Sequence, residues 1–212
     1  MGFQYTAIGD SLTTGFGALP GNGFVPVYRR TAESRLGAFV ASSNLGVNGM
    51  TTADLEQQLR RSNGFRQSVR EADIITMSIG GNDLIHAAKS GGGPSGISPR
   101  VLQKSLQECR ENFAGIMSSL RQLKAGTREP YIIRIVGLYN PYPQIAEATA
   151  WVRQFNQYAS GYSSRVVGFA SIYGDFAGNE RSLLSIDHLH PNGRGYRVIA
   201  NKLDGLRYGM LY

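Results

Sequence analysis

Short apolar runs alternate along the chain with stretches in which apolar residues return every three or four positions. The runs have β-prone composition, whereas the spacing between them is helical. The alternation predicts a five-stranded parallel sheet with helices on both faces, a three-layer α/β/α fold. The expected strands are residues 4–8, 39–45, 74–79, 131–137 and 166–170, and the expected helices are residues 24–36, 52–61, 64–71, 99–124, 148–165 and 192–206.

Length and composition favour one domain over residues 1–212, because 42% of the 212 residues are hydrophobic and only 17% are charged. No apolar run approaches the roughly 20 residues that a membrane-spanning helix requires. The first residues enter a strand at once, which leaves no room for a signal peptide. We therefore expect a protein that is cytosolic, exported by another route or already trimmed. The single cysteine, Cys109, is expected to pack inside a helix.

A net charge of +7 is compatible with attraction to anionic lipid or nucleic acid. The basic residues are scattered and no nucleic-acid-binding motif accompanies them, so no nucleic acid partner is expected. Peripheral contact with anionic lipid stays open. The glycine-rich segment 91–96 lacks the Gly-Lys-Ser/Thr ending of a phosphate-binding loop and is interpreted as a flexible loop, with a lid as a hypothesis.

Polar clusters follow three of the expected strands, and a fourth precedes the last helix. In open parallel sheets, functional groups gather at the carboxyl ends of the strands. Ser98 is not part of these clusters, since it precedes Pro99 and is expected only to cap the helix that follows. The four clusters are Gly9-Asp10-Ser11-Leu12, the segment 44–51 with Gly46 and Gly49, Gly80-Gly81-Asn82-Asp83, and Asp187-His188-Leu189-His190.

Each cluster alone has an ordinary structural explanation. A serine after a strand most often caps a helix, and glycine or asparagine there usually forms a turn. Together, however, the clusters supply the parts of a hydrolytic site. Ser11 is a nucleophile, Asp187 can hold the imidazole of His190 in one tautomer, and the Asn82 amide can donate to an oxyanion.

In these four clusters the chain resembles the GDSL or SGNH hydrolase family, whose motif blocks match in order between residues 9 and 190. The resemblance implies a flavodoxin-like fold and a reaction without a cofactor. It implies that Ser11 attacks an ester carbonyl, His190 transfers the proton and Asp187 orients His190. The oxyanion hole would comprise the Ser11 N–H, a glycine N–H and the Asn82 side chain. Gly49, two residues before Thr51, matches the family block better than Gly46.

A finer resemblance is to the spore-associated lipases and esterases of bacilli, which implies a cytoplasmic or spore-associated protein. It rests on residues 138–143, Trp151, Phe155-Asn156 and Ser185-Ile186-Asp187. Aromatic and proline residues of this set are expected to line a substrate cleft, although packing is the alternative for Trp151. The expected substrates are short to medium acyl esters or phospholipids. Carbohydrate acetyl esters and thioesters remain alternatives, because the triad touches only the carbonyl group.

Other classes fit less well. The elbow of α/β-hydrolases needs G-x-S-x-G, whereas the chain has Gly9-Asp10-Ser11-Leu12-Thr13. A metal site at His188 and His190 lacks a third ligand nearby, so no metal is expected. A noncatalytic lipid- or glycan-binding module has no need of an activated serine. Asp10 and Asp83 are expected to fix their loops, and His86 is expected on a helix after Asn82.

Overall fold

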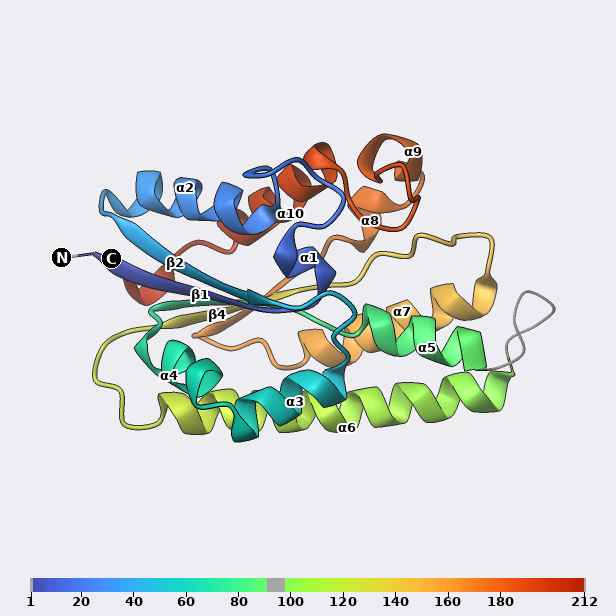
Figure 1. Cartoon of the computed structure of the whole chain (residues 1–212), viewed down its shortest axis with the longest axis horizontal. Helices are drawn as coiled ribbons and strands as arrows, with labels where there is room; N and C mark the ends of the chain where they lie inside the picture. The colour runs from blue at the N-terminus through green and yellow to red at the C-terminus, as the bar shows by residue number, and fades with distance from the viewer. Residues whose placement is uncertain (1, 91–97, 212) are drawn as a thin grey trace.

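The computed structural model describes residues 2–90 and 98–211. Five strands form one parallel sheet in the order β2-β1-β3-β4-β5, as the sequence predicted (Figure 1). Each strand ends within two residues of its predicted boundary. The order reverses between β1 and β3, the place where open α/β sheets bind their ligands. The strands are β1 Phe3–Gly9, β2 Val40–Gly46, β3 Ile74–Ser78, β4 Ile132–Val136 and β5 Val167–Ala170.

Helices cover both faces of the sheet, which confirms the three layers (Figure 1). One face carries α2 (Phe24–Leu36) and α10 (Gly193–Gly205). The opposite face carries α3 (Thr52–Arg61), α4 (Asn63–Glu71), α5 (Gly81–Ser90), α6 (Pro99–Lys124) and α7 (Ala146–Ser160). Short helical turns complete the described chain: α1 (Ser11–Thr14), α8 (Tyr173–Phe176), α9 (Glu180–Leu183) and η2 (Gly209–Leu211).

Two apolar cores hold the layers together. Neighbouring strand residues point to opposite faces of a sheet, so Ile74 packs beneath α2 and α10 while Ile75 packs beneath the helices of the other face. In β4, Ile132 likewise packs on the side of α2 and α10, and Ile133 packs on the opposite side. No helix within the described ranges is long and apolar enough to cross a bilayer.

The ends of some helices differ from the prediction. Helix α7 stops at Ser160 instead of 165, because Gly161 and the serines after it form a turn in which Ser164 bonds the backbone of Val167. Ser98 is the residue before α6, and Pro99 is the first helical residue, as predicted. The Ser98 side chain, however, makes no capping hydrogen bond. The expected loop 91–96 lies outside the described residues.

Candidate active site

The local backbone of β1 and α1 presents Ser11. Gly9 has φ +133°, and a Cβ at this position would lie 1.9 Å from the carbonyl oxygen of Ser78, so only glycine fits there. Asp10 then caps α1 by accepting a hydrogen bond from the Leu12 N–H at 3.0 Å. Ser11 is consequently the first residue of a short helix at the carboxyl edge of the sheet.

A tight turn before α10 fixes Asp187. Its Oδ1 accepts hydrogen bonds from the Ser185 hydroxyl at 2.7 Å, the Leu189 N–H at 3.0 Å and the His190 N–H at 2.9 Å. Its Oδ2 lies 2.6 Å from Nδ1 of His190. Burial opposes the charge on this carboxyl, but these hydrogen bonds outweigh it and hold the pKa of Asp187 well below its usual range. The carboxylate is therefore charged and its orientation is fixed.

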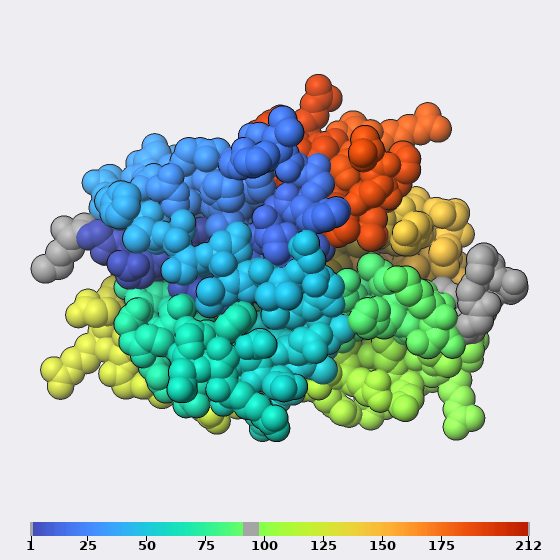
Figure 2. Space-filling model, in the orientation of Figure 1, coloured from blue at the N-terminus to red at the C-terminus, as the bar shows by residue number. Residues whose placement is uncertain are grey.

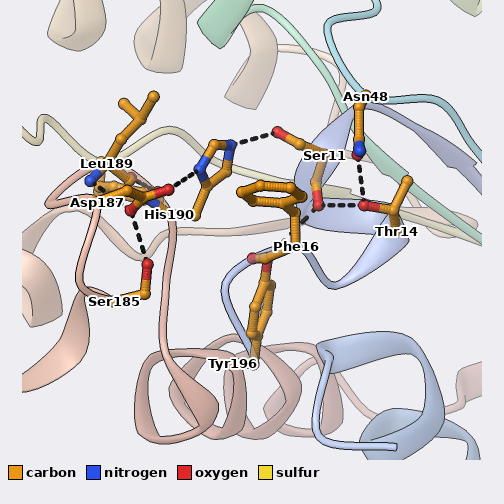
Figure 3. Close-up of polar contacts among 10 residues, drawn as sticks. Ser11, Thr14, Phe16, Asn48, Ser185, Asp187, Leu189, His190 and Tyr196 are labelled. Atoms are coloured by element: carbon orange, nitrogen blue, oxygen red, sulfur yellow. Dashed lines mark hydrogen bonds and ion pairs between the residues drawn. The ribbon is translucent and has the colours of Figure 1, made fainter. Parts of the chain in front are cut away.

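His190 links the two ends of the chain. Its Nε2 lies 2.9 Å from Oγ of Ser11, while its Nδ1 faces Asp187 (Figure 3). The ring of Phe16 packs on the imidazole with the ring centroids 4.6 Å apart, and only 16% of the His190 side chain is exposed. The three predicted triad residues are thus brought together in one hydrogen-bonded chain. This geometry is the one that serine hydrolases use for acyl transfer.

Two donors suited to an oxyanion lie at the cavity that Ser11 lines. The Ser11 N–H is at a helix start, where no intrahelical acceptor exists, and it has no acceptor in the described part of the chain. The Asn82 amide donates one hydrogen to the Met50 carbonyl at 2.9 Å, which orients the group and leaves its second hydrogen available. Ser11, Asn82 and His190 line one cavity.

The structure separates the two glycines of the second cluster. Gly46 ends β2, its N–H donates to Oδ1 of Asn44 at 3.0 Å, and a Cβ there would lie 2.8 Å from Thr13. Gly49 has φ +81° and no acceptor for its N–H within the described ranges. It does not line the cavity, but it adjoins Met50, whose carbonyl holds Asn82. These contacts favour Gly49 as the donor.

An apolar cavity opens beside the triad, with an empty volume of about 780 Å³ that includes its open mouth. The predicted cleft segment after β4 does line it. Trp151 instead stacks on Phe155 outside the cavity, as the packing alternative for this residue predicts. The apolar lining comes from Leu84, Ile85 and Ala88 of α5, from Leu138, Tyr139, Pro141, Tyr142 and Ile145, and from Ala148 and Val152 of α7.

Other candidates from the sequence fall outside the triad. Asp83 accepts hydrogen bonds from the N–H and hydroxyl of Thr52, so it fixes the segment after β2, as predicted. His86 lies on α5. His188 is exposed at φ +55°, so the segment is not extended and the two histidines do not form a pair. No group of three or more His, Cys, Asp or Glu side chains in the described residues is placed to hold a metal ion.

Several supporting residues were not predicted. The Tyr196 hydroxyl donates to the Phe16 carbonyl at 2.6 Å and thereby holds the loop that carries Phe16 (Figure 3). The Tyr139 hydroxyl donates to the Leu189 carbonyl at 2.6 Å and supports the turn that carries His190. Tyr196 belongs to no motif, and Tyr139 was expected only as part of the cleft segment 138–143. Ser185 stood in the sequence two residues before Asp187, and that spacing was the available signal for its bond to the carboxylate.

Asp10 is buried, and burial raises its pKa to about 6 although Ser78 and Leu12 donate to it. Between the unfolded value of 3.8 and about 6, the unfolded chain loses this proton while the folded chain keeps it. The contribution of Asp10 to the free energy of unfolding therefore falls by about 3 kcal/mol as pH rises through that window. Asp10→Asn should gain stability relative to wild type by about this amount between pH 3.5 and pH 7.

Urea unfolding of both proteins over that pH range measures the difference. Asp54→Asn is the control, because hydrogen bonds from Thr51 lower the pKa of Asp54, so this variant should show a smaller change of opposite sign. Parallel stability curves for wild type and Asp10→Asn would contradict the burial of an ionisable Asp10.

Comparison with known proteins agrees with this fold. Residues 7–198 match the model of the GDSL-like Lipase/Acylhydrolase family, and the chain belongs to that family. It is 34% identical to the spore germination lipase LipC of Bacillus licheniformis over 100% of this chain and 99% of the relative. The resemblance seen in the four clusters is thus confirmed, and the chain is a GDSL-type lipase or esterase.

Solved structures show the same architecture. The lipase Lip_vut3 from a goat rumen metagenome superposes with a TM-score of 0.92 at 33% identity, covering 99% of this chain and 100% of that one. The acetylxylan esterase Axe2 of Geobacillus stearothermophilus superposes with a TM-score of 0.66 at 17% identity, covering 96% of this chain and 93% of that one. At that identity the second likeness concerns the fold alone.

Proposed function

We propose that this chain hydrolyses carboxylic esters of short to medium acyl chains, phospholipids included, through an acyl-serine intermediate. The observation that carries the proposal is the continuous chain of hydrogen-bonding contacts from Asp187 through His190 to Ser11, beside an apolar cavity. Membership of a lipase family and the similarity to a spore germination lipase support it. The same similarity supports a cytoplasmic or spore-associated location.

In this mechanism His190 Nε2 takes the proton from the Ser11 hydroxyl as Oγ attacks the ester carbonyl. The charged Asp187 stabilises the imidazolium that forms. The N–H groups of Ser11 and Gly49 and the free hydrogen of the Asn82 amide stabilise the tetrahedral oxyanion. His190 then returns its proton to the leaving alcohol. Water repeats the sequence on the acyl-serine and releases the acid.

The lining of the cavity favours an acyl chain over a sugar beside the carbonyl. Apart from Asn82, helices α5 and α7 contribute only apolar side chains to it, and burial of methylene groups is favourable by about 0.8 kcal/mol each. Ala148 is 4% exposed and lies in the wall formed by α7. A larger side chain at this position should shorten the space that an acyl chain can occupy.

We therefore expect Ala148→Leu to keep hydrolysing p-nitrophenyl acetate while losing about tenfold or more in kcat/KM on the octanoate, since several methylene groups lose their site. Ala150→Leu on the same helix is the matched control, because Ala150 is exposed and outside the cavity. A panel of acyl lengths from two to twelve carbons measures the effect. Identical chain-length profiles for wild type and Ala148→Leu would rule out this cavity as the acyl site.

A further inference from the structure

Exposed large apolar side chains concentrate around the mouth of the cavity. Five of the six in the described residues belong to loops at the carboxyl edge of the sheet. We call Phe16, Leu19, Val47, Tyr142 and Ile186 the apolar rim. Leu19 is 76% exposed and Ile186 is 98% exposed. Water-exposed apolar groups gathered in one place mark an interaction surface.

Contacts between loops place Phe16, Tyr142 and the turn that carries Ile186 beside the triad. Phe16 packs on His190, and Tyr142 lines the cavity with Ser11. Gly17, which follows Phe16, lies against the turn that carries Ile186, since a Cβ on Gly17 would be 3.1 Å from the Ser185 hydroxyl. In Figure 2 a blue segment from the N-terminal part of the chain and the orange-red C-terminal segment adjoin near the top centre of the viewed face.

The loops that carry the rim contain almost no charged residues. Segments 15–23, 47–51, 141–145 and 185–191 contain a single acidic residue, Asp187, which pairs with His190. At the start of α10, Arg194 and Arg197 are exposed and have no carboxylate partner in the described chain. The Leu19 turn reaches this helix, because its end at Asn22 lies 3.6 Å from a Cβ placed on Gly193.

We propose that the apolar rim and these arginines dock the enzyme onto the surface of an anionic phospholipid aggregate. Apolar side chains enter the boundary of the acyl chains while cations face the headgroups. Docking places the mouth of the cavity against the lipid, so that an acyl ester passes into the cavity without crossing water. The inference rests on the proposed function and specifies substrates presented at a lipid surface.

The test measures binding without turnover, in the Ser11→Ala background. Sedimentation with vesicles of phosphatidylcholine and phosphatidylglycerol should show binding that falls about tenfold or more on adding Leu19→Ser and Ile186→Ser. Adding Arg194→Gln and Arg197→Gln instead should reduce binding about tenfold on these vesicles, but little on pure phosphatidylcholine. Phe39→Ser is the matched control, because Phe39 is 68% exposed but precedes β2 at the opposite edge of the sheet.

Thermal unfolding checks that each variant is folded. Equal vesicle binding by the parent and the rim variant, or an equal loss in Phe39→Ser, would overturn the proposal. A parent that does not bind vesicles but forms a dimer, with a monomeric rim variant, would also overturn it and assign the rim to self-association. Because binding is measured without Ser11, these outcomes are separate from those that test ester hydrolysis.

Discussion

Replacing Ser11 with alanine should lower kcat for p-nitrophenyl butyrate by a factor on the order of 10⁶, the scale of effect for removing the nucleophile of a triad. The change deletes one oxygen, and His190 then has no hydroxyl to deprotonate at its Nε2. The apolar lining of the cavity and the oxyanion donors remain in place, so substrate binding should survive. Steady-state kinetics of purified wild type and variant measure the loss.

Ser34→Ala is the control for this prediction, because Ser34 is an exposed serine on α2, away from the site. Its kcat should stay within about twofold of wild type, as expected for a surface substitution. Equal turnover by wild type and Ser11→Ala would contradict the serine mechanism. It would also revive the interpretation of the chain as a binding module that retains the fold.

Asp187→Asn should lower kcat by about 10⁴-fold. The Asn oxygen can still accept from Ser185, Leu189 and the His190 N–H, so the turn keeps its shape. The amide nitrogen then faces Nδ1 of His190 and donates to it. The imidazole must carry its proton on Nε2 and cannot accept the proton of Ser11. The loss should fall on kcat, because Asp187 does not line the cavity.

Asp175→Asn provides the comparison, since Asp175 pairs with Lys202 at 3.1 Å on the surface and such pairs contribute little. Kinetics of both variants at the same pH separate the general effect of losing a carboxylate from the effect on the histidine. A loss of less than about tenfold in Asp187→Asn would show that this carboxylate does not set the tautomer.

Local patterns were sufficient to predict the sheet and the meeting of the three residues of the candidate triad. Consecutive strand residues such as Ile74-Ile75 and Ile132-Ile133 are both apolar although they face opposite sides of the sheet. This pattern identifies strands that are buried on both faces. The site was predictable because each part follows a strand end or lies in one short turn. Asp187 is three residues from His190, and Ser11 directly follows Asp10, which links the end of β1 to the start of α1. Parallel strand ends then meet at one edge of the sheet.

The remaining features depend on contacts between distant segments. The Tyr196 bond to Phe16 joins residues 180 positions apart, and no short motif encodes it. Leu19 and Ile186 are apolar, so sequence patterns alone favour burial for them, yet both are exposed. The early end of α7 is an exception with a local cause. The apolar spacing would continue the helix beyond Ser160, but a turn begins there and ends it.

In the proposed reaction Ser11 is the residue that becomes acylated. Reaction with a p-nitrophenyl phosphonate ester, followed by mass spectrometry of the peptides, tests it most directly, since the adduct on the nucleophile is stable. We predict one adduct per chain, on Ser11, that is absent in Ser11→Ala and forms slowly in Asp187→Asn. An adduct on another residue, or full turnover of p-nitrophenyl butyrate by protein that is fully labelled at Ser11, would contradict the account.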